Sequence, residues 1–492
     1  MGKVNRTIYL IAAVAMSVAG CISNEQSESQ SETESAEPNR PNIIYILADD
    51  LGYGDLSIYG QEKFETPNID ALAKQGMLFT QHYSGATVCA PSRSALLTGL
   101  HTGHTPIRGN KEVRPEGQYP LPDSVLTLPK LMKNAGYVTG AFGKWGLGAP
   151  GSEGDPMNQG VDEFYGYNCQ RFGHNYYPYH LWHNSDSLVL EDNAGNQSNS
   201  YAPELIHQQA LNFIEENKDQ PFFLFMPSII PHAELVAPET YMKDYRGRFD
   251  PEPVYEGVDE GPEFRQGPYM SQKEPHAAFV AMIHILDQQV GEIVEKVKAQ
   301  GIEDNTLIIF TSDNGPHLEG GADPDFFNSN GIYKGYKRDL YEGGIRVPMI
   351  ASWPSKIRAG STSEHISAFW DVLPTLAELT GQSIPNELDG LSFLPTLLGE
   401  PIQARHDYLY WEFHEKGGRK ALRQGDWKIV QYDVNREPQG SYQLYNLIVD
   451  PSEEQDLANQ HPEKLEDLKV LIDGARTDSE VFVFGSSTYL AK

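Results

Sequence analysis

The residues best placed to do chemistry lie in one short run, Val88-Cys89-Ala90-Pro91-Ser92-Arg93-Ser94-Ala95-Leu96-Leu97-Thr98-Gly99. Pro91 suits the first turn of a helix, and Gly99 follows about two turns later, where a helix would stop. Cys89 is therefore predicted at the positive end of a short helix, where a negative charge is stabilised. A lone cysteine is also commonly a small buried apolar residue, so this run alone leaves a reactive and a structural thiol open.

Carboxylates follow two apolar runs that read as buried strands. Asp49 and Asp50 come directly after the run at residues 42–47, and Asp313 and Asn314 follow a second such run. Hard oxygen ligands without a cluster of His or Cys favour calcium or magnesium over zinc or copper. Each pair alone is also an ordinary turn sequence. Together they predict a divalent cation site.

The elements that must position these groups form a repeating pattern. Five short runs rich in β-branched or aromatic residues predict strands at residues 42–47, 137–142, 222–226, 306–311 and 347–352. They alternate with helical patterns, which favours an α/β fold with a large mixed, mainly parallel sheet between helices. Functional groups gather beyond the carboxyl ends of such strands. The polar residues in that position are Asp49, Asp50, Lys144, His232 and Asp313.

The pattern changes after about residue 404. Short strands are predicted at residues 408–411, 420–423, 427–431 and 442–446, followed by a helix over residues 462–475. This order indicates a small antiparallel sheet covered by a helix. We therefore expect a catalytic domain over residues 40–403 and a C-terminal subdomain over residues 404–492.

Charge limits the classes of partner. The chain of 492 residues has 68 acidic and 38 basic side chains, a net charge of -30. Its length suits one large α/β domain with a smaller one. The negative charge argues against nucleic acid and against an anionic membrane surface as partners. An anionic substrate would need a locally positive pocket, for which Arg93, Lys144 and Lys337 are the candidates.

The N-terminus reads as a targeting segment. Two basic residues precede an apolar run at residues 8–18 that is too short to span a bilayer, and Val-Ala-Gly-Cys ends at Cys21. Residues 1–21 resemble a bacterial lipoprotein signal whose cleavage leaves a lipidated Cys21; an ordinary secretory signal is the alternative. Residues 22–39 have the composition of a disordered tether. The protein is thus expected to be exported and to meet a membrane only through this lipid.

The run around Cys89 resembles the signature of the type I sulfatases, in which that cysteine is oxidised to formylglycine before folding. The resemblance extends from about residue 40 to the C-terminal helix and includes Gly143-Lys144-Trp145 and Lys337 ahead of Glu342-Gly343-Gly344. It implies an alkaline-phosphatase-like fold and a sulfuric ester hydrolase, most similar to the arylsulfatase A and N-acetylgalactosamine-sulfatase branch. A formylglycine-generating enzyme would be a partner during maturation.

The same resemblance implies roles for single residues. One Ca2+ would be held by Asp49, Asp50, Asp313 and Asn314, with the modified Cys89 completing its ligands. The catalytic set would be Cys89, Arg93, Lys144, His232 and Lys337. In it His232 is the general acid for the leaving oxygen, and the basic residues grip the sulfate. One hydroxyl of the hydrated aldehyde would attack sulfur, and the second would then collapse to the aldehyde and expel sulfate.

One position departs from the family pattern. Most such sulfatases read Gly-Lys-Trp-His, and that histidine helps the second hydroxyl lose its proton, whereas this chain has Gly146. Either another group takes over the task or the step is slower. His317, His174 and Lys144 are the candidates, which the sequence does not rank.

The substrate is expected to be a sulfated carbohydrate, with galactose or N-acetylgalactosamine sulfates suggested by the branch. Residues 168–184 combine many aromatic side chains with Arg and His and show little strand or helix pattern. Aromatic faces stack on sugar rings, so this segment predicts a carbohydrate pocket, although a packed aromatic loop has the same composition. Arg171, His174 and His317 are the candidate substrate contacts.

Three other interpretations remain open from the sequence. A disulfide between Cys89 and Cys169 would suit an oxidising compartment and would abolish the chemistry. A phosphonate or phosphate ester hydrolase would use the same aldehyde and pocket. The third interpretation is an inert surface lipoprotein that binds sulfated glycan, which Gly146 suggests.

Overall fold

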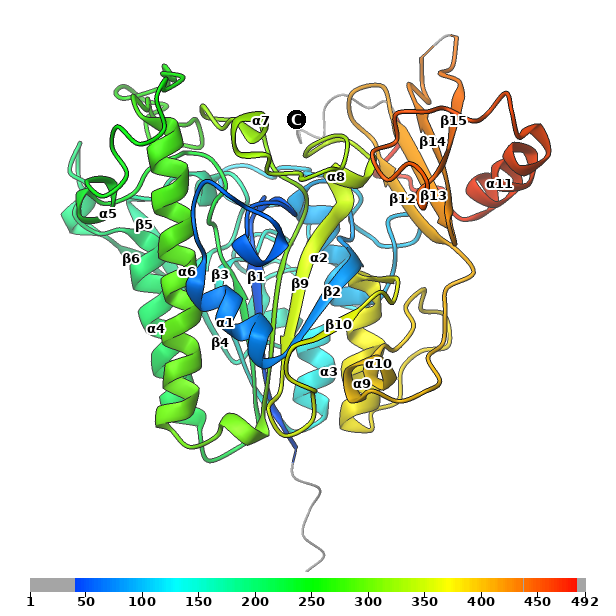
Figure 1. Ribbon diagram of the computed structural model, residues 1–492. Coiled ribbons are helices and arrows are strands. Elements are labelled where there is room, and N and C mark those ends of the chain that lie inside the picture. The colour runs from blue at the N-terminus through cyan, green and yellow to red at the C-terminus, as the bar shows by residue number, and fades with distance from the viewer. Residues whose placement is uncertain (1–39, 437, 485–492) are drawn as a thin grey trace, which may run out of the picture. The chain divides into compact units, whose positions relative to one another are not determined.

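The large sheet has eleven strands in the order β10-β2-β9-β8-β1-β7-β3-β4-β5-β6, with β11 also paired to β2 (Figure 1). A computed structural model describes residues 40–436 and 438–484, so the predicted signal and tether at residues 1–39 lie outside the described residues. The strands are β1 (Asn42–Ala48), β2 (Met77–Tyr83), β3 (Val138–Lys144), β4 (Glu163–Tyr167), β5 (His180–His183), β6 (Asp186–Val189), β7 (Phe222–Pro227), β8 (Thr306–Ser312), β9 (Arg346–Ser352), β10 (Ser361–Ser363) and β11 (Ser367–Ala368).

The centre of this sheet is parallel, as predicted. β1 lies between β7 and β8, and Ile43 is in register with Phe223 on one side and Leu307 on the other. β9 runs antiparallel to both β8 and β2, which makes the sheet mixed. Because β1, β3, β7 and β8 run in the same direction, the loops that follow them meet at one edge.

Helices cover both faces. They are α1 (Pro67–Gln75), α2 (Cys89–Thr98), α3 (Leu128–Asn134), α4 (Ala202–Asn217), α5 (Glu239–Met242), α6 (Pro275–Ala299), α7 (Pro324–Phe327), α8 (Glu342–Ile345), α9 (Val372–Thr380), α10 (Leu394–Leu398) and α11 (Pro462–Gly474). Figure 1 shows α4 and α6 on one side of the sheet and α3, α9 and α10 on the other. Alternate side chains of β1 point to the two sides: Ile44 and Ile46 join the core under α6, and Ile43 joins the core under α3.

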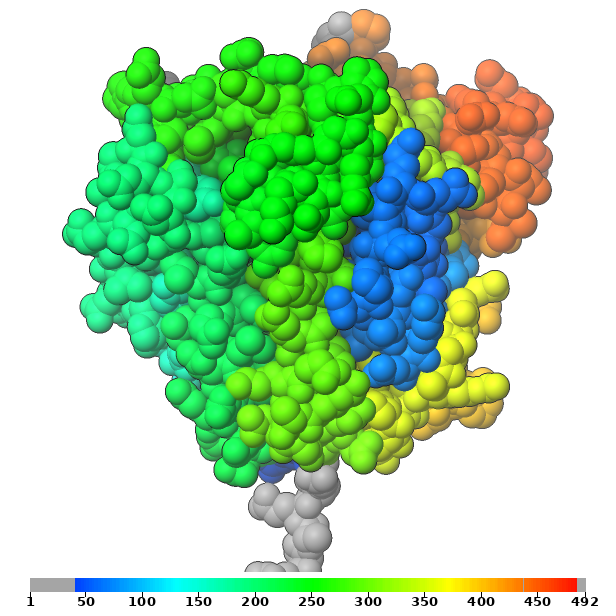
Figure 2. Space-filling model, turned by 60° about the vertical axis from the view of Figure 1, so that its left-hand side comes forward, coloured from blue at the N-terminus to red at the C-terminus, as the bar shows by residue number. Residues whose placement is uncertain are grey.

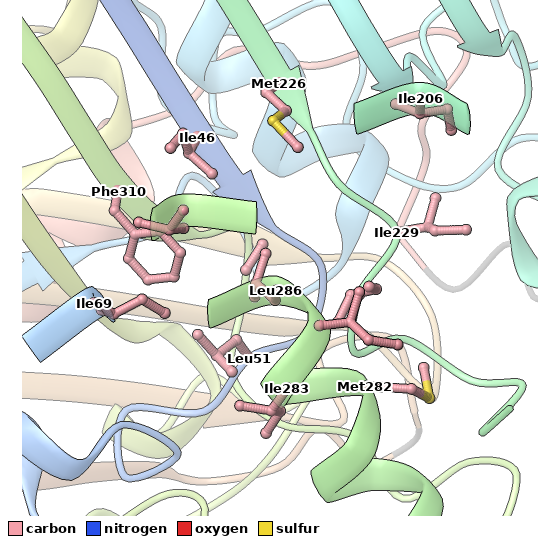
Figure 3. Close-up of a cluster of buried hydrophobic side chains, with 14 of the residues drawn as sticks. Ile46, Leu51, Ile69, Ile206, Met226, Ile229, Met282, Ile283, Leu286 and Phe310 are labelled. Atoms are coloured by element: carbon pink, nitrogen blue, oxygen red, sulfur yellow. The ribbon is translucent and has the colours of Figure 1, made fainter. Parts of the chain in front are cut away.

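Helix α6 is the central element of the first core. Ile283 and Leu286 of α6 pack with Ile46 and Phe310 of the sheet (Figure 3). Within the described residues α6 is the helix long and apolar enough to cross a membrane, but 72% of its apolar window is buried inside the protein. Its apolar character is therefore that of a core helix.

A buried carboxylate joins α6 to α1. Asp287 of α6 accepts hydrogen bonds from the backbone N–H groups of Asn68 and Ile69, at 3.0 and 2.8 Å. These donors lie in the first turn of α1, where a helix leaves its N–H groups without internal partners. Figure 2 shows the blue segment that includes α1 on the surface, beside the green segment that includes α6.

The C-terminal part forms a second sheet in the order β12-β13-β14-β15, antiparallel throughout. Its strands are β12 (Leu409–Phe413), β13 (Arg419–Gln424), β14 (Trp427–Tyr432) and β15 (Tyr442–Asn446). Helix α11 packs on this sheet through Leu468 and Ile472. The expected small antiparallel sheet with a helix on it is therefore confirmed, with strand ends that differ by one or two residues.

The segment at residues 168–184 is more regular than its sequence suggests. Residues His180–His183 form β5, which pairs antiparallel with β4 and with β6. The expectation of little strand structure is therefore wrong there. A strand of four residues at the margin of a sheet shows almost no alternation, because hydrogen bonds to its neighbours rather than its own pattern define it.

Buried charges tie the two sheets together. The Lys428 ammonium of β14 lies 2.9 Å from Glu342 of α8 and 2.9 Å from Glu453, and all three side chains are fully buried. Tyr83 of β2 donates a hydrogen bond to the second oxygen of Glu342, at 2.6 Å. The small sheet thus holds the segment that begins α8 in one position.

We expect Lys428→Met to lower the free energy of unfolding by about 3–5 kcal/mol, because the buried Glu453 loses its ion-pair partner and Glu342 keeps only Arg346, at 3.3 Å. Chemical denaturation of both proteins measures the difference. Lys469→Met is the matched control, since Lys469 pairs with Glu466 on the exposed surface of α11 and such pairs contribute about 1 kcal/mol or less. Equal effects of the two substitutions would contradict the buried network.

Candidate active site

Helix α2 begins at Cys89 and ends before Gly99, as its sequence predicts. The preceding Val88 is extended, and Gly99 has a φ of 71°, in the left-handed region that favours glycine. All ten residues of α2 are buried. The helix therefore places Cys89 inside the protein, at the edge where the central strands end.

The Cys89 thiol is held between a carboxylate and an ammonium. It donates a hydrogen bond to Oδ1 of Asp49 at 3.2 Å, and Nζ of Lys144 lies 3.7 Å from Sγ. Burial, followed by the charge of Asp49, raises the pKa of this thiol well above its usual value. Cys89 and Cys169 are both free, so the structure does not contain the disulfide considered as an alternative. An uncharged thiol is a weak nucleophile, which suits a residue that acts only after modification.

Oxygen ligands gather beside Cys89. Asp49, Asp50, Asp313 and Asn314 are fully buried. The Asp50 N–H donates to Oδ1 of Asp313 at 3.1 Å, and the Asn314 amide donates to Oδ1 of Asp50 at 2.6 Å. The ligand atoms of Asp49, Asp50, Cys89 and His232 lie within 4.8 Å of one another. The predicted metal residues are thus brought together.

A divalent cation fits this donor set. Oδ1 of Asn314 is buried and has no hydrogen-bond partner, which is unusual for an amide oxygen in a protein interior. The surrounding donors are carboxylate oxygens, which hard cations prefer. Asp50 has a φ of 65°, a conformation that costs energy in a non-glycine residue; its N–H contacts Asp313 and its carboxylate contacts Asn314.

Three buried cations balance the carboxylates. Nη2 of Arg93 lies 3.2 Å from Asp49 and 2.9 Å from Asp313. Lys144 forms an ion pair with Asp49, and Nζ of Lys337 lies 2.7 Å from Asp50. Burial alone would raise the pKa of Asp49, but Lys144 and Arg93 lower it below its usual value.

Asp313 differs from its neighbours. Burial, followed by the charge of Asp49, raises the pKa of Asp313 to about 7. The attraction of Arg93 therefore does not fully offset the cost of burying the Asp313 carboxylate beside Asp49. A further positive charge at this place would stabilise it.

His232 and Lys337 form a pair at the rim of the group. Nζ of Lys337 lies 2.9 Å from Nε2 of His232, while Nδ1 of His232 is held by the carbonyl of Ala233. Burial, followed by the charge of Lys337, lowers the pKa of His232 well below its usual value. The imidazole is therefore neutral, with its Nε2 lone pair directed at the ammonium.

The predicted substrate contacts lie around this pair. The ring of His174 stacks on His232 with centroids 4.7 Å apart, and the ring of His317 also stacks on His232, at 5.7 Å. Arg171 lies farther out and pairs with Glu112 at 2.5 Å. Of the three candidates to act for the missing histidine at Gly146, Lys144 is the one with a contact to Cys89.

The structure adds residues that the sequence did not indicate. Asn110 accepts a hydrogen bond from the N–H of Ala90 at 3.0 Å. Glu319 lies 3.4 Å from Lys337 and reduces the positive charge of the pocket. Gln170 fills the space beside Gly146. Only Glu319 had a sequence signal, because it follows the same strand as Asp313.

Family comparisons agree with this geometry. The protein-family model described as Sulfatase matches residues 41–382, more than half of the chain. The chain belongs to the sulfatase family. A second model, described as N-sulphoglucosamine sulphohydrolase, C-terminal, matches residues 331–473. The expected sulfuric ester hydrolase activity is thereby confirmed, and this family generally uses a formylglycine and a divalent metal ion.

Individual relatives of the sulfatase cover most of its length. N-acetylgalactosamine-6-O-sulfatase of Bacteroides thetaiotaomicron is 29% identical over 97% of this chain and all of the relative. Human N-acetylgalactosamine-6-sulfatase is 32% identical over 76% of this chain and 69% of the human protein. The crystal structure of Ps i-CgsB in complex with k-i-k-neocarrahexaose is 29% identical, with a TM-score of 0.72, and covers 89% of this chain and 93% of that chain. The predicted branch and alkaline-phosphatase-like fold are confirmed.

Divalent cations should stabilise the sulfatase, because they bind the cluster of carboxylates in the folded protein and not the unfolded chain. At 100 times the Kd the gain is about 2.7 kcal/mol, measurable as a rise in melting temperature that a chelator reverses. Asp50→Asn removes one charge while Asn still tolerates the left-handed backbone, so the rise should shrink. Asp244→Asn, at an exposed position, is the control. An undiminished rise with Asp50→Asn would contradict the site.

Proposed function

We propose that this sulfatase releases sulfate from a sulfated carbohydrate, with Cys89 converted to formylglycine and Ca2+ as the metal ion. The observation that carries the proposal is the position of Cys89 at the start of α2, between Asp49 and Lys144 and within a ring of three buried cations. A sulfate ester is an anion. Together with a bound divalent cation, these three side chains would form the positive pocket that the net charge of -30 makes necessary. The names of the relatives support a sugar as the alcohol part.

Each residue around position 89 has a part in sulfate transfer. A metal ion bound by Asp49, Asp50, Asp313 and Asn314 would lower the pKa of a hydroxyl on the hydrated aldehyde. Ca2+ suits a site built from carboxylate and amide oxygens. Arg93 orients the nucleophile with its planar guanidinium, which Asp49 and Asp313 hold in place. Lys144 and Lys337 bind the sulfate oxygens.

The leaving oxygen receives its proton from the His232 and Lys337 pair. The pair shares a proton between two nitrogens 2.9 Å apart, at the rim of the buried group. As the bond from sulfur to the sugar oxygen breaks, the proton passes to that oxygen and the alcohol departs. The remaining hydroxyl of residue 89 then gives its proton to solvent water, the carbon to oxygen double bond forms again, and sulfate leaves with the bonding electrons.

Lys144 is our candidate to replace the missing histidine at residue 146. Its ammonium lies 3.7 Å from Sγ of Cys89 and is fixed by the ion pair with Asp49. From there it stabilises the negative charge that develops when the second hydroxyl loses its proton. His174 and His317 contact His232 and thus face the leaving-group side.

The predicted export signal and lipid anchor at Cys21 remain part of this proposal and rest on the sequence. A formylglycine-generating enzyme would act on Cys89 before export and folding, because the folded chain buries this residue. The lipid would keep the enzyme at a membrane with its substrate outside the cell or in the periplasm.

The chemistry is tested with paired aryl esters. We expect a higher kcat/KM for an aryl sulfate than for the matching phosphonate, and a peptide mass that shows formylglycine at residue 89. Cys89→Ala should reduce turnover by roughly 10^3-fold or more, as loss of a nucleophile does in other enzymes. Cys169→Ala is the control, because this second buried cysteine has no part in the proposed reaction. A preference for phosphorus would favour the phosphonate hydrolase, and absence of turnover with formylglycine present would favour a glycan-binding lipoprotein.

Membrane attachment is tested by detergent phase partition of protein made in a bacterial host. The wild type should enter the detergent phase, because its lipid is apolar, whereas Cys21→Ser should not. Ser27→Ala, in the predicted tether, should behave as the wild type. If Cys21→Ser also enters the detergent phase, the lipid is not at this residue.

A further inference from the structure

A cavity of about 430 Å3 opens beside the catalytic group. Its lining includes Asn110, Gln118, Gln170, Arg171, His174 and Tyr269. Asn110 connects the cavity to the nucleophile, because it accepts a hydrogen bond from Ala90, the residue after Cys89. His174 connects it to the acid, because its ring stacks on His232. An alcohol that leaves from residue 89 toward His232 would therefore enter this cavity.

Two amide oxygens of the lining have no partner. Oε1 of Gln170 and Oε1 of Gln118 are both buried, and the two residues are only 5% and 3% exposed. Buried acceptors without hydrogen bonds are rare in folded proteins, and they often mark places where a ligand supplies the missing donor. Hydroxyl groups of a sugar are such donors.

The side chain of Gln170 fills the space that a side chain at residue 146 would occupy. Gly146 has a φ of 73°, and a Cβ placed on it would lie 1.8 Å from Nε2 of Gln170. Any larger residue at position 146 would displace the glutamine. The departure from the family pattern at Gly146 is therefore coupled to the presence of Gln170 beside the cavity.

The cations of the lining are already engaged. Arg171 pairs with Glu112 at 2.5 Å and donates hydrogen bonds to the carbonyls of Pro115 and Gln266. Arg114 also pairs with Glu112, at 3.1 Å. Both arginines are thus paired with a carboxylate, so the positive charge of this lining is already engaged.

We infer that this cavity holds a sugar ring whose only anionic group is the sulfate to be removed, with ring hydroxyls donating to Gln170 and Gln118. A second sulfate or a carboxylate on the same ring would meet acceptor oxygens and paired arginines, and would be rejected by desolvation and repulsion. The inference rests on the proposed function and deepens it. It makes Gln170 a specificity-determining residue and Arg171 part of the cavity frame.

The formylglycine-containing enzyme is assayed on N-acetylgalactosamine 4-sulfate, its 6-sulfate, the 4,6-disulfate and an aryl sulfate. We expect kcat/KM for one of the monosulfated sugars to exceed that for the disulfate at least about tenfold. A disulfate that is hydrolysed as well as or better than both would overturn the inference. So would turnover of the aryl sulfate alone, with no sugar sulfate hydrolysed or competing. Absence of turnover on all four would overturn the proposed function as well.

The role of Gln170 is tested with Gln170→Leu and, separately, Gln118→Leu. Each should raise KM for the sugar sulfate, so that the ratio of kcat/KM on sugar to aryl sulfate falls about tenfold. The melting temperature should not fall, because leucine removes a buried oxygen that has no partner and, in Gln170, only one long hydrogen bond, from the amide nitrogen to the Gly146 carbonyl at 3.5 Å. Gln460→Leu, at an exposed position on the C-terminal part, should change neither quantity. A lower melting temperature, with both rates reduced in proportion, would assign Gln170 a structural role and overturn the inference.

Discussion

The structure depends on a balance of buried charge at one edge of the large sheet. Asp49, Asp50 and Asp313 lie buried with Arg93, Lys144 and Lys337. Removing any one of these side chains would leave the charge of its partner buried without compensation. Such a group is stable only if the backbone delivers every member at a fixed distance. The parallel strands do this for Asp49 and Asp313, because β1 and β8 are paired in register up to Ala48 and Ser312.

Lys337 needs a different support, because it lies on a loop rather than after a strand. Its segment is held from the C-terminal sheet: Arg419 pairs with Asp339 at 2.6 Å, and Tyr432 accepts a hydrogen bond from the N–H of Leu340 at 3.0 Å. The buried Lys428 network fixes the same segment at Glu342. The small sheet thus contributes to catalysis without placing a residue in the site, since it determines where the Lys337 ammonium stands.

The sequence could indicate that the inner charged residues lie together, because the signals for their positions are local. A strand followed by acidic residues, or a cysteine before a helix-starting proline, needs only neighbours along the chain to be interpreted. Gln170 and Asn110 gave no such signal, because each acquires its place through a partner far away in the chain: Gly146 for one and Ala90 for the other. The short strand β5 was missed for the same reason, as its hydrogen bonds to β4 and β6 define it.

The two parts of the site, the surroundings of residue 89 and the adjoining cavity, also differ in their charge. Around residue 89, a bound divalent ion and the three basic side chains together would carry more positive charge than the three carboxylates carry negative charge. This part therefore selects an anion. In the adjoining cavity Arg171 and Arg114 are paired with Glu112, and the lining residues Gln170 and Gln118 carry amide oxygens that have no hydrogen-bond partner. An ester that joins a sulfate to a neutral, hydroxyl-bearing ring satisfies both parts at once, because its charge lies at one end. The sulfate ester bond to be broken then lies at the boundary between the charged part around residue 89 and the cavity.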